Sequence, residues 1–204
     1  MSYLISYTGK RIDLPNPNPA NIDIVDVATH LSRIPRFVGS TDRFFSVAQH
    51  SVVVAYLAVA VGQHYSPPPH LEFTVLHTLL REGLLHDAHE AYMGDVPSPL
   101  KSVCAGFKSS EGHIDRAVRQ AFSMANTMPP HVKTADRIAL ILESGHLRGP
   151  DRLDMTRIPQ EVKDLVVKLA RTEWFKLAEW EVAKDWPCET AKDKFLEEWD
   201  RLES

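Results

Sequence analysis

Residues 84–91 read L-L-H-D-A-H-E-A, so an apolar segment ends abruptly in a cluster of ionisable side chains. Leucines recur at helical spacing before this cluster, which predicts a helix over Phe73–Met93. His86, Asp87 and Glu90 then share one patch of that helix, because residues three and four apart are neighbours on its surface. A His-Asp pair alone is more simply read as a hydrogen-bonded histidine beside a helix cap. Buried and unpaired charges cost several kcal/mol, however, so the whole cluster indicates a site.

The remaining chain also reads as helices, which prolines separate. Ser46–Val61 is almost wholly apolar, and such a helix is typically buried on every side at the centre of a bundle. Tyr3–Tyr7 indicates a short strand. The other amphipathic segments are Ile22–Leu31, 111–125, 131–147, 161–186 and Ala191–Leu202. We therefore expect an all-α helical bundle with a short N-terminal β element.

Length and composition indicate one globular domain. The 204 residues are 44% hydrophobic, which is enough for one core. We expect one domain over 1–204, with its core at about 22–147 and C-terminal helices at about 160–202. The net charge of -4 does not indicate the basic surface that binding of duplex nucleic acid requires. Cys104 and Cys188 do not have the spacing of a thiolate zinc motif. No apolar run reaches the ~20 residues that span a bilayer, and the N-terminus has no signal-peptide pattern, so we expect a cytoplasmic protein.

Two further ionisable residues stand among apolar neighbours. His50 lies in the middle of one predicted helix and Asp136 in the middle of another, although helix interiors rarely bury lone charges. A bundle can bring both together with His86 and Asp87. Two imidazoles and two carboxylates suit a divalent cation such as Zn, Mn, Co or Fe and leave coordination positions open for water, as catalysis requires. Seven histidines without an acid on a shared face are read as surface or capping residues: His30, His64, His70, His77, His113, His131 and His146.

These residues carry a resemblance to a known superfamily. His50, the His86-Asp87 pair and Asp136 follow the order and spacing of the H…HD…D signature of HD-domain metal-dependent phosphohydrolases. The strings A-Q-H-S-V-V-V-A, L-L-H-D-A-H-E-A-Y-M-G-D-V-P-S-P-L-K and V-K-T-A-D-R-I-A resemble the branch that contains bacterial 5'-deoxynucleotidases and phage deoxyadenosine triphosphate triphosphohydrolases. The likeness spans most of 22–145, and the N-terminal Y-T-G-K-R-I-D-L is more similar to the phage members. The resemblance implies an HD-domain helical bundle.

The resemblance also implies roles for further residues. Glu90 matches a glutamate that works as general acid and base beside the metal in related enzymes. The substrate-binding residues that it implies are Arg36, Lys101 and Lys133 for phosphate, Asp95 for the deoxyribose hydroxyl and Phe37 for the base. The bacterial nucleotidases tend to carry Arg-Trp where this chain has Arg36-Phe37, which resembles the phage branch. His89 receives no role.

One leading hypothesis and two alternatives follow from the resemblance. It favours the hydrolysis of dATP, or of another dNTP, to the deoxynucleoside and triphosphate. The resemblance implies a divalent metal ion such as Zn, Co or Mn, and it leaves open whether a second ion such as Mg joins the substrate phosphates. A 5'-deoxynucleotidase acting on deoxynucleoside monophosphates shares every residue named above, and a non-catalytic, metal-stabilised binding module is the alternative from another class. Members of the family form homo-oligomers, so the resemblance also implies a homo-oligomer. We expect it in the cytoplasm of a bacterium, or in that of the host cell if a phage encodes the chain.

Overall fold

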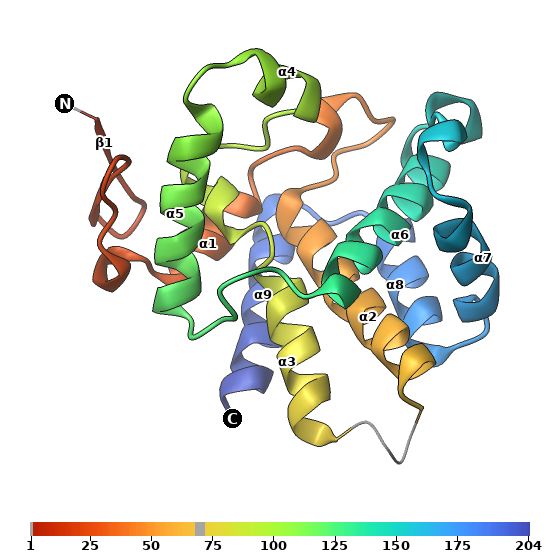
Figure 1. The fold of residues 1–204 in the computed structure, drawn as a ribbon. Coiled ribbons are helices and arrows are strands. Elements are labelled where there is room, and N and C mark those ends of the chain that lie inside the picture. Colours follow the sequence, from red (N-terminus) through yellow and green to blue (C-terminus); the bar gives the residue numbers. More distant parts are fainter. Residues whose placement is uncertain (1, 68–71) are drawn as a thin grey trace.

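The computed structural model describes residues 2–67 and 72–204, and His70 lies outside this part of the chain. Helices make up most of the described residues, and the only strands among them form one small hairpin, which confirms the predicted all-α class (Figure 1). Within them, no helix is long and apolar enough to cross a membrane. The helices are α1 (Ile24–Leu31), α2 (Val47–Tyr65), α3 (Phe73–Leu84), α4 (Ser98–Val103), α5 (Phe107–Ala121), α6 (Pro130–Leu147), α7 (Gln160–Leu169), α8 (Glu173–Ala183) and α9 (Cys188–Glu203).

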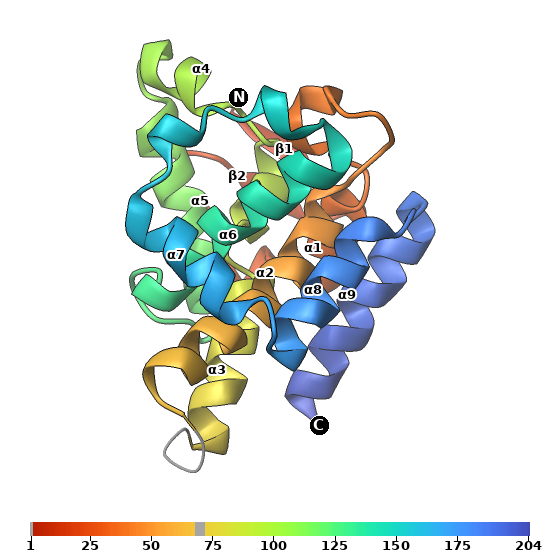
Figure 2. The ribbon, with the colours of Figure 1, turned by 90° about the vertical axis from the view of Figure 1, so that its right-hand side faces the viewer.

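Helix α2 forms the centre of the bundle. Its residues from Val47 to Gly62 are all buried, as the apolar sequence predicts. Ser46 begins the helix, because its Oγ accepts a hydrogen bond from the backbone N–H of Gln49. Helices α3, α6, α8 and α9 pack around α2 (Figures 1 and 2). A polar side chain on α2 is therefore held away from bulk water.

The N-terminal β element is a hairpin in which β1 (Tyr3–Ile5) pairs antiparallel with β2 (Arg11–Asp13). The sequence predicts only the first of these strands. Asp26 on α1 fastens the hairpin to the bundle, because its buried carboxylate accepts hydrogen bonds from the N–H and the hydroxyl of Thr8 at 2.7 and 2.9 Å. Ile12 of β2 is fully buried, so the hairpin also contributes to the core.

The predicted helix Phe73–Met93 is wrong in its second half. Helix α3 ends before the His-Asp pair, and a 3-10 helix over Ala88–Tyr92 follows a turn. Nδ1 of His86 donates a hydrogen bond of 2.8 Å to the carbonyl oxygen of Gly83, which a continuing helix would use for its own backbone. His86 and Asp87 thus lie in the turn and not on a helix face.

The predicted helix over 161–186 is likewise divided, into α7 and α8. Thr172 begins α8, because its hydroxyl accepts the backbone N–H of Phe175 at 3.3 Å. Phe175 and Trp186 are buried in the core, whereas Trp180 is 58% exposed. Helices α8 and α9 both pack against α2, so the C-terminal part of the chain completes the packing of the central helix (Figures 1 and 2).

Candidate metal centre and active site

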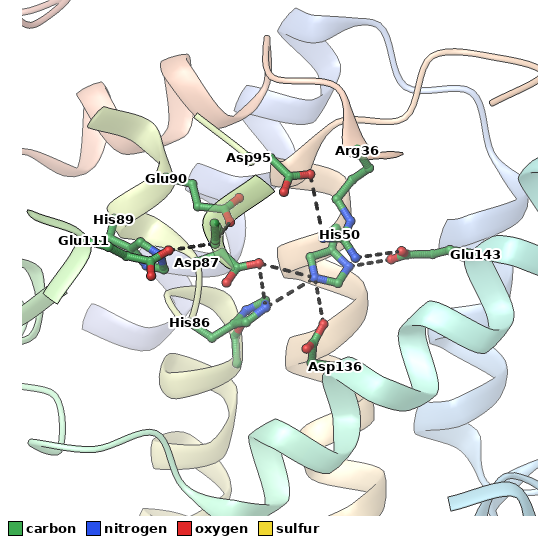
Figure 3. A network of polar contacts seen from close by, with 12 residues as sticks. Arg36, His50, His86, Asp87, His89, Glu90, Asp95, Glu111, Asp136 and Glu143 are labelled. Atoms are coloured by element: carbon green, nitrogen blue, oxygen red, sulfur yellow. Dashed lines mark hydrogen bonds and ion pairs between the residues drawn. The ribbon is translucent and has the colours of Figure 1, made fainter. Parts of the chain in front are cut away.

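Three elements bring the four predicted metal ligands together (Figure 3). His50 projects from α2, Asp136 from α6, and His86 and Asp87 from the turn after α3. Nε2 of His50 lies 3.2 Å from Nε2 of His86 and 3.6 Å from Oδ2 of Asp87. It also lies 3.3 Å from Oδ1 of Asp136, while Nε2 of His86 is 3.0 Å from Oδ2 of Asp87. Residues far apart in the chain therefore converge on one point.

Hydrogen bonds behind the two imidazoles fix the direction of each ring. His86 is held through Nδ1 by the carbonyl oxygen of Gly83, and Nδ1 of His50 lies 2.5 Å from Oε1 of Glu143 on α6. A proton on Nδ1 of each ring satisfies both contacts and leaves Nε2 free as a ligand atom. Gly83 is required here, because a Cβ would lie 2.6 Å from Cα of Ala55 on α2.

The charges around these side chains favour a bound cation. Burial and Arg36 lower the pKa of His50, but the surrounding carboxylates outweigh them and hold it well above its ordinary value. Burial raises the pKa values of Asp87 and Asp136, but the two histidines hold both below the ordinary value. His50, His86 and Asp87 place ligand atoms within 4.8 Å of one another. This donor set fits a divalent cation, which would replace the shared protons.

Glu90 lies beside the ligands in the 3-10 helix. It is only 4% exposed, and its Oε2 has no hydrogen-bond partner among the residues that the structure describes. Burial, together with the charges of Asp87 and Asp95, raises the pKa of Glu90 to about 9. Nζ of Lys101 lies 3.7 Å from Oε1. Glu90 therefore keeps a proton at neutral pH in the metal-free site.

Arg36 is a largely buried arginine that two carboxylates hold. Its Nη2 donates to Oε2 of Glu143 at 3.2 Å, and its Nη1 lies 4.0 Å from Oδ2 of Asp95. Burial lowers the pKa of Arg36, but the neighbouring carboxylates raise it further than burial lowers it. Nε has no partner in the described part of the chain, so this donor of the guanidinium group remains for a ligand.

Phe37 follows Arg36 in a left-handed turn beside the site. Phe37 and Val38 both have φ of 55°, a conformation that is strained for a β-branched residue. Two guanidinium groups contact the ring of Phe37: Cζ of Arg36 lies 5.4 Å and Cζ of Arg148 lies 4.9 Å from the ring centroid. The ring of Phe37 therefore lies beside Arg36, and its contact with the base remains a prediction.

The two lysines stand in different surroundings. Lys101 lies on α4, and its Nζ is 2.6 Å from Oε1 of Glu111 on α5. Nε2 of His89 lies 3.5 Å from the same oxygen. The contact with His89 and then that with Lys101 lower the pKa of Glu111 to about 2. Lys133 is exposed on α6, one turn before Asp136.

Two carboxylates of the site are missing from the set predicted from the sequence. Glu143 follows Asp136 by seven residues, which is two turns of α6, so both side chains lie on one face and the spacing itself is a usable signal. Glu111 carries no comparable signal, because α5 reaches Lys101 only through the fold.

Comparisons with known proteins agree with this geometry. Residues 26–147 match the family described as 5'-deoxynucleotidase YfbR-like. The chain is 36% identical over 143 residues to the protein YfdR of Escherichia coli, an alignment that covers 70% of this chain and 71% of that protein. It is 29% identical over 174 residues to a protein of Rhodobacter capsulatus, with 79% and 84% covered. The chain therefore belongs to the YfbR-like family of HD-domain metal-dependent phosphohydrolases, enzymes that act on small deoxynucleotides.

Proposed function

We propose that the chain is a 5'-deoxynucleotidase that releases orthophosphate from deoxynucleoside monophosphates. The ion pair between Lys101 and Glu111 carries the proposal, because it neutralises a cation that would otherwise face the phosphate chain. Arg36 is likewise neutralised by Glu143 and Asp95. A monophosphate needs fewer free positive charges than a triphosphate does. The description of the matching family supports the same substrate.

The four side chains that converge at the site, His50, His86, Asp87 and Asp136, would hold the divalent cation. When bound, such a cation polarises the phosphoryl group and lowers the pKa of a coordinated water. Zn, Co and Mn are the candidates, and an ion such as Mg accompanies the substrate phosphates.

The other residues of the site bind the substrate and move the proton. Glu90, which lies buried beside the ligands, donates a proton to the departing 5'-oxygen. Nε of Arg36 binds a phosphoryl oxygen, while Lys101 stays paired with Glu111. Asp95 accepts a hydrogen bond from the deoxyribose hydroxyl. These contacts orient a deoxynucleotide with its phosphate at the metal ligands.

A dATP triphosphohydrolase is the second candidate. Lys133 favours it, because an exposed cation one turn before Asp136 can meet a longer phosphate chain. The likeness of the N-terminus and of Phe37 to phage enzymes supports the same substrate. Its products would be deoxyadenosine and intact triphosphate.

Product analysis separates these candidates. Metal-free protein is loaded with Zn, Co or Mn in turn, with and without Mg, and incubated with each of the four deoxynucleoside mono- and triphosphates. Anion-exchange chromatography then resolves the products, and we expect orthophosphate from monophosphates. Release of intact triphosphate from dATP would overturn this proposal in favour of a dATP triphosphohydrolase. If no substrate were hydrolysed with any of the metals, the result would favour the non-catalytic, metal-stabilised binding module.

Glu90→Gln tests whether Glu90 transfers a proton in the reaction. Glutamine keeps the shape of the side chain but has no proton to transfer, so we expect the cation to bind as in the parent while kcat falls at least about 100-fold. Turnover at the parental rate would remove Glu90 from the mechanism.

We also propose that the protein is a homo-oligomer. The resemblance to the family supports this, and helices α7 and α8 each leave an apolar side chain on the surface, with Val167 76% exposed and Trp180 58% exposed. Sedimentation velocity at micromolar concentration tests this assignment, and a single monomeric species would contradict it.

A further inference from the structure

We propose that Glu143 is a positioning residue that joins the metal centre to Arg36, so that cation occupancy and substrate binding depend on each other. The identity of the substrate rests on the proposed function, whereas the tests below need no nucleotide. Glu143 lies on α6 and is fully buried. Both of its carboxylate oxygens are occupied inside the site (Figure 3).

One oxygen of Glu143 faces the metal ligand His50. Oε1 lies 2.5 Å from Nδ1 of the imidazole, and an ionised carboxylate only accepts hydrogen bonds, so Nδ1 carries the proton. Nε2 faces Asp87 and Asp136, and it would offer its lone pair to a cation bound between these side chains. A carboxylate behind a ligating histidine fixes the tautomer, orients the ring and makes it a stronger ligand.

The other oxygen of Glu143 faces Arg36. Oε2 accepts a hydrogen bond of 3.2 Å from Nη2, while Asp95 stands 4.0 Å from Nη1, so the guanidinium group is held at both ends. Its Nε is buried and has no partner among the described residues. A buried donor without a partner is unfavourable, and a ligand oxygen at this place would relieve it. The direction of this donor depends on Glu143.

Because one carboxylate makes both contacts, the two sides of the site are linked. When His50 serves as a ligand, its Nδ1–H becomes a stronger donor, and Glu143 is drawn toward the ring. Arg36 is then held less tightly and is freer to bind the substrate. Such a coupling is reciprocal, so a change at Arg36 also alters the affinity of the site for the cation.

Glu143→Gln tests the first half of the link. The glutamine amide has one acceptor oxygen, so it cannot serve His50 and Arg36 together as the carboxylate does. We expect the affinity for Zn²⁺, measured by competition with a chromophoric chelator, to fall about 10-fold to 100-fold. Parental affinity in E143Q would overturn the proposal.

Two further variants separate positioning from general stability. Glu198→Gln removes a carboxylate that accepts the hydroxyl of Tyr56 far from the ligands, and we expect it to bind Zn²⁺ like the parent. Glu143→Asp keeps the charge on a shorter side chain, and its affinity should lie between those of parent and E143Q. An E198Q variant as weak as E143Q would show that lost stability explains the effect.

The ring of His50 provides a direct spectroscopic reading. In the Zn²⁺-loaded parent we expect the imidazole ¹⁵N spectrum to show a protonated Nδ1 that exchanges slowly with water. In E143Q the same proton should exchange faster, because its acceptor is weakened. An unchanged spectrum would show that Glu143 does not set the tautomer.

A double-mutant cycle tests the second half of the link. Arg36→Gln should change the affinity for Zn²⁺ by a larger factor in the parent than in E143Q, because the contact through Glu143 adds to the direct effect of the arginine charge on the ligands. Effects that simply add would overturn the coupling. Since no nucleotide is present, a failed coupling and a failed deoxynucleotidase assignment give different results.

Discussion

Glu90 is an acid whose folded environment opposes its charge, and this predicts how stability changes with pH. Its pKa is raised from 4.5 to about 9, so the unfolded chain loses this proton above pH 4.5 while the folded protein keeps it. Glu90 therefore lowers the stability of the metal-free protein progressively as pH rises from 4.5 toward 9, by at most about 1.4 kcal/mol per pH unit.

Glu90→Gln removes this titration. Urea unfolding of metal-free parent and variant at pH 5, 6.5 and 8 should show the variant gaining stability relative to the parent at each step. A difference that stays constant across this range would contradict the raised pKa of Glu90.

Glu111 provides a test of the charge balance on which the proposed substrate depends. Glu111→Gln releases Lys101, so we expect the inhibition constant of dATP against dAMP hydrolysis to fall about threefold to tenfold, which corresponds to roughly 1 kcal/mol. Asp115→Asn is the control, because it removes a carboxylate one turn further along α5, where Asp115 pairs with Arg119. Equal inhibition of parent and E111Q would mean that Lys101 does not select the phosphate chain.

Single residues differ in how well the sequence predicts them. His50 and Asp136 can be found because each is a lone ionisable group among apolar neighbours, and the structure brings them together with the His-Asp pair. The sequence does not show in this way whether a basic residue is paired with a carboxylate. Lys101 and Arg36 look like free cations in the sequence, and their partners are supplied by other helices.

The close approach of α2 and α3 depends on Gly83. A Cβ at this position would lie 2.6 Å from Cα of Ala55, so Gly83→Ala must push the helices apart and displace the carbonyl that holds His86. We expect a loss of roughly 1–3 kcal/mol in urea unfolding, together with weaker Zn²⁺ binding.

Gly112→Ala on α5 is the matched control for Gly83. Its Cβ would meet only the flexible end of Arg116 at 3.7 Å, so this variant should be unchanged or more stable by up to about 1 kcal/mol. The same loss at both glycines would argue against a specific contact between α2 and α3.

Helices are predicted well where periodicity defines them and poorly where a side chain ends them. The segment predicted over 131–147 closely matches α6 (Pro130–Leu147). Helix α3 stops because His86 bonds the carbonyl oxygen of Gly83, and α8 starts anew because Thr172 caps it. Apolar spacing continues across both points, so periodicity alone does not reveal them.

The C-terminal helices contribute to the core that holds the site, although the family match ends at residue 147. Gln49, beside His50, donates its side-chain amide to the carbonyl oxygen of Glu181 at 2.8 Å, and Phe195 of α9 is fully buried. A chain ending at residue 147 would expose the side of α2 that α8 and α9 cover. We expect it to be unfolded by circular dichroism, and a folded, Zn²⁺-binding fragment would contradict a single domain.

The complete burial of α2 also has a consequence for how the protein is made. Its 16 residues from Val47 to Gly62 are apolar on nearly every face, and the ribosome delivers them before α6, α8 and α9, which later cover them. The nascent chain must therefore carry an unprotected apolar segment until its C-terminal end emerges, and such segments attract chaperones or aggregate. The dry surroundings of His50 in the finished enzyme are thus a source of aggregation risk during translation.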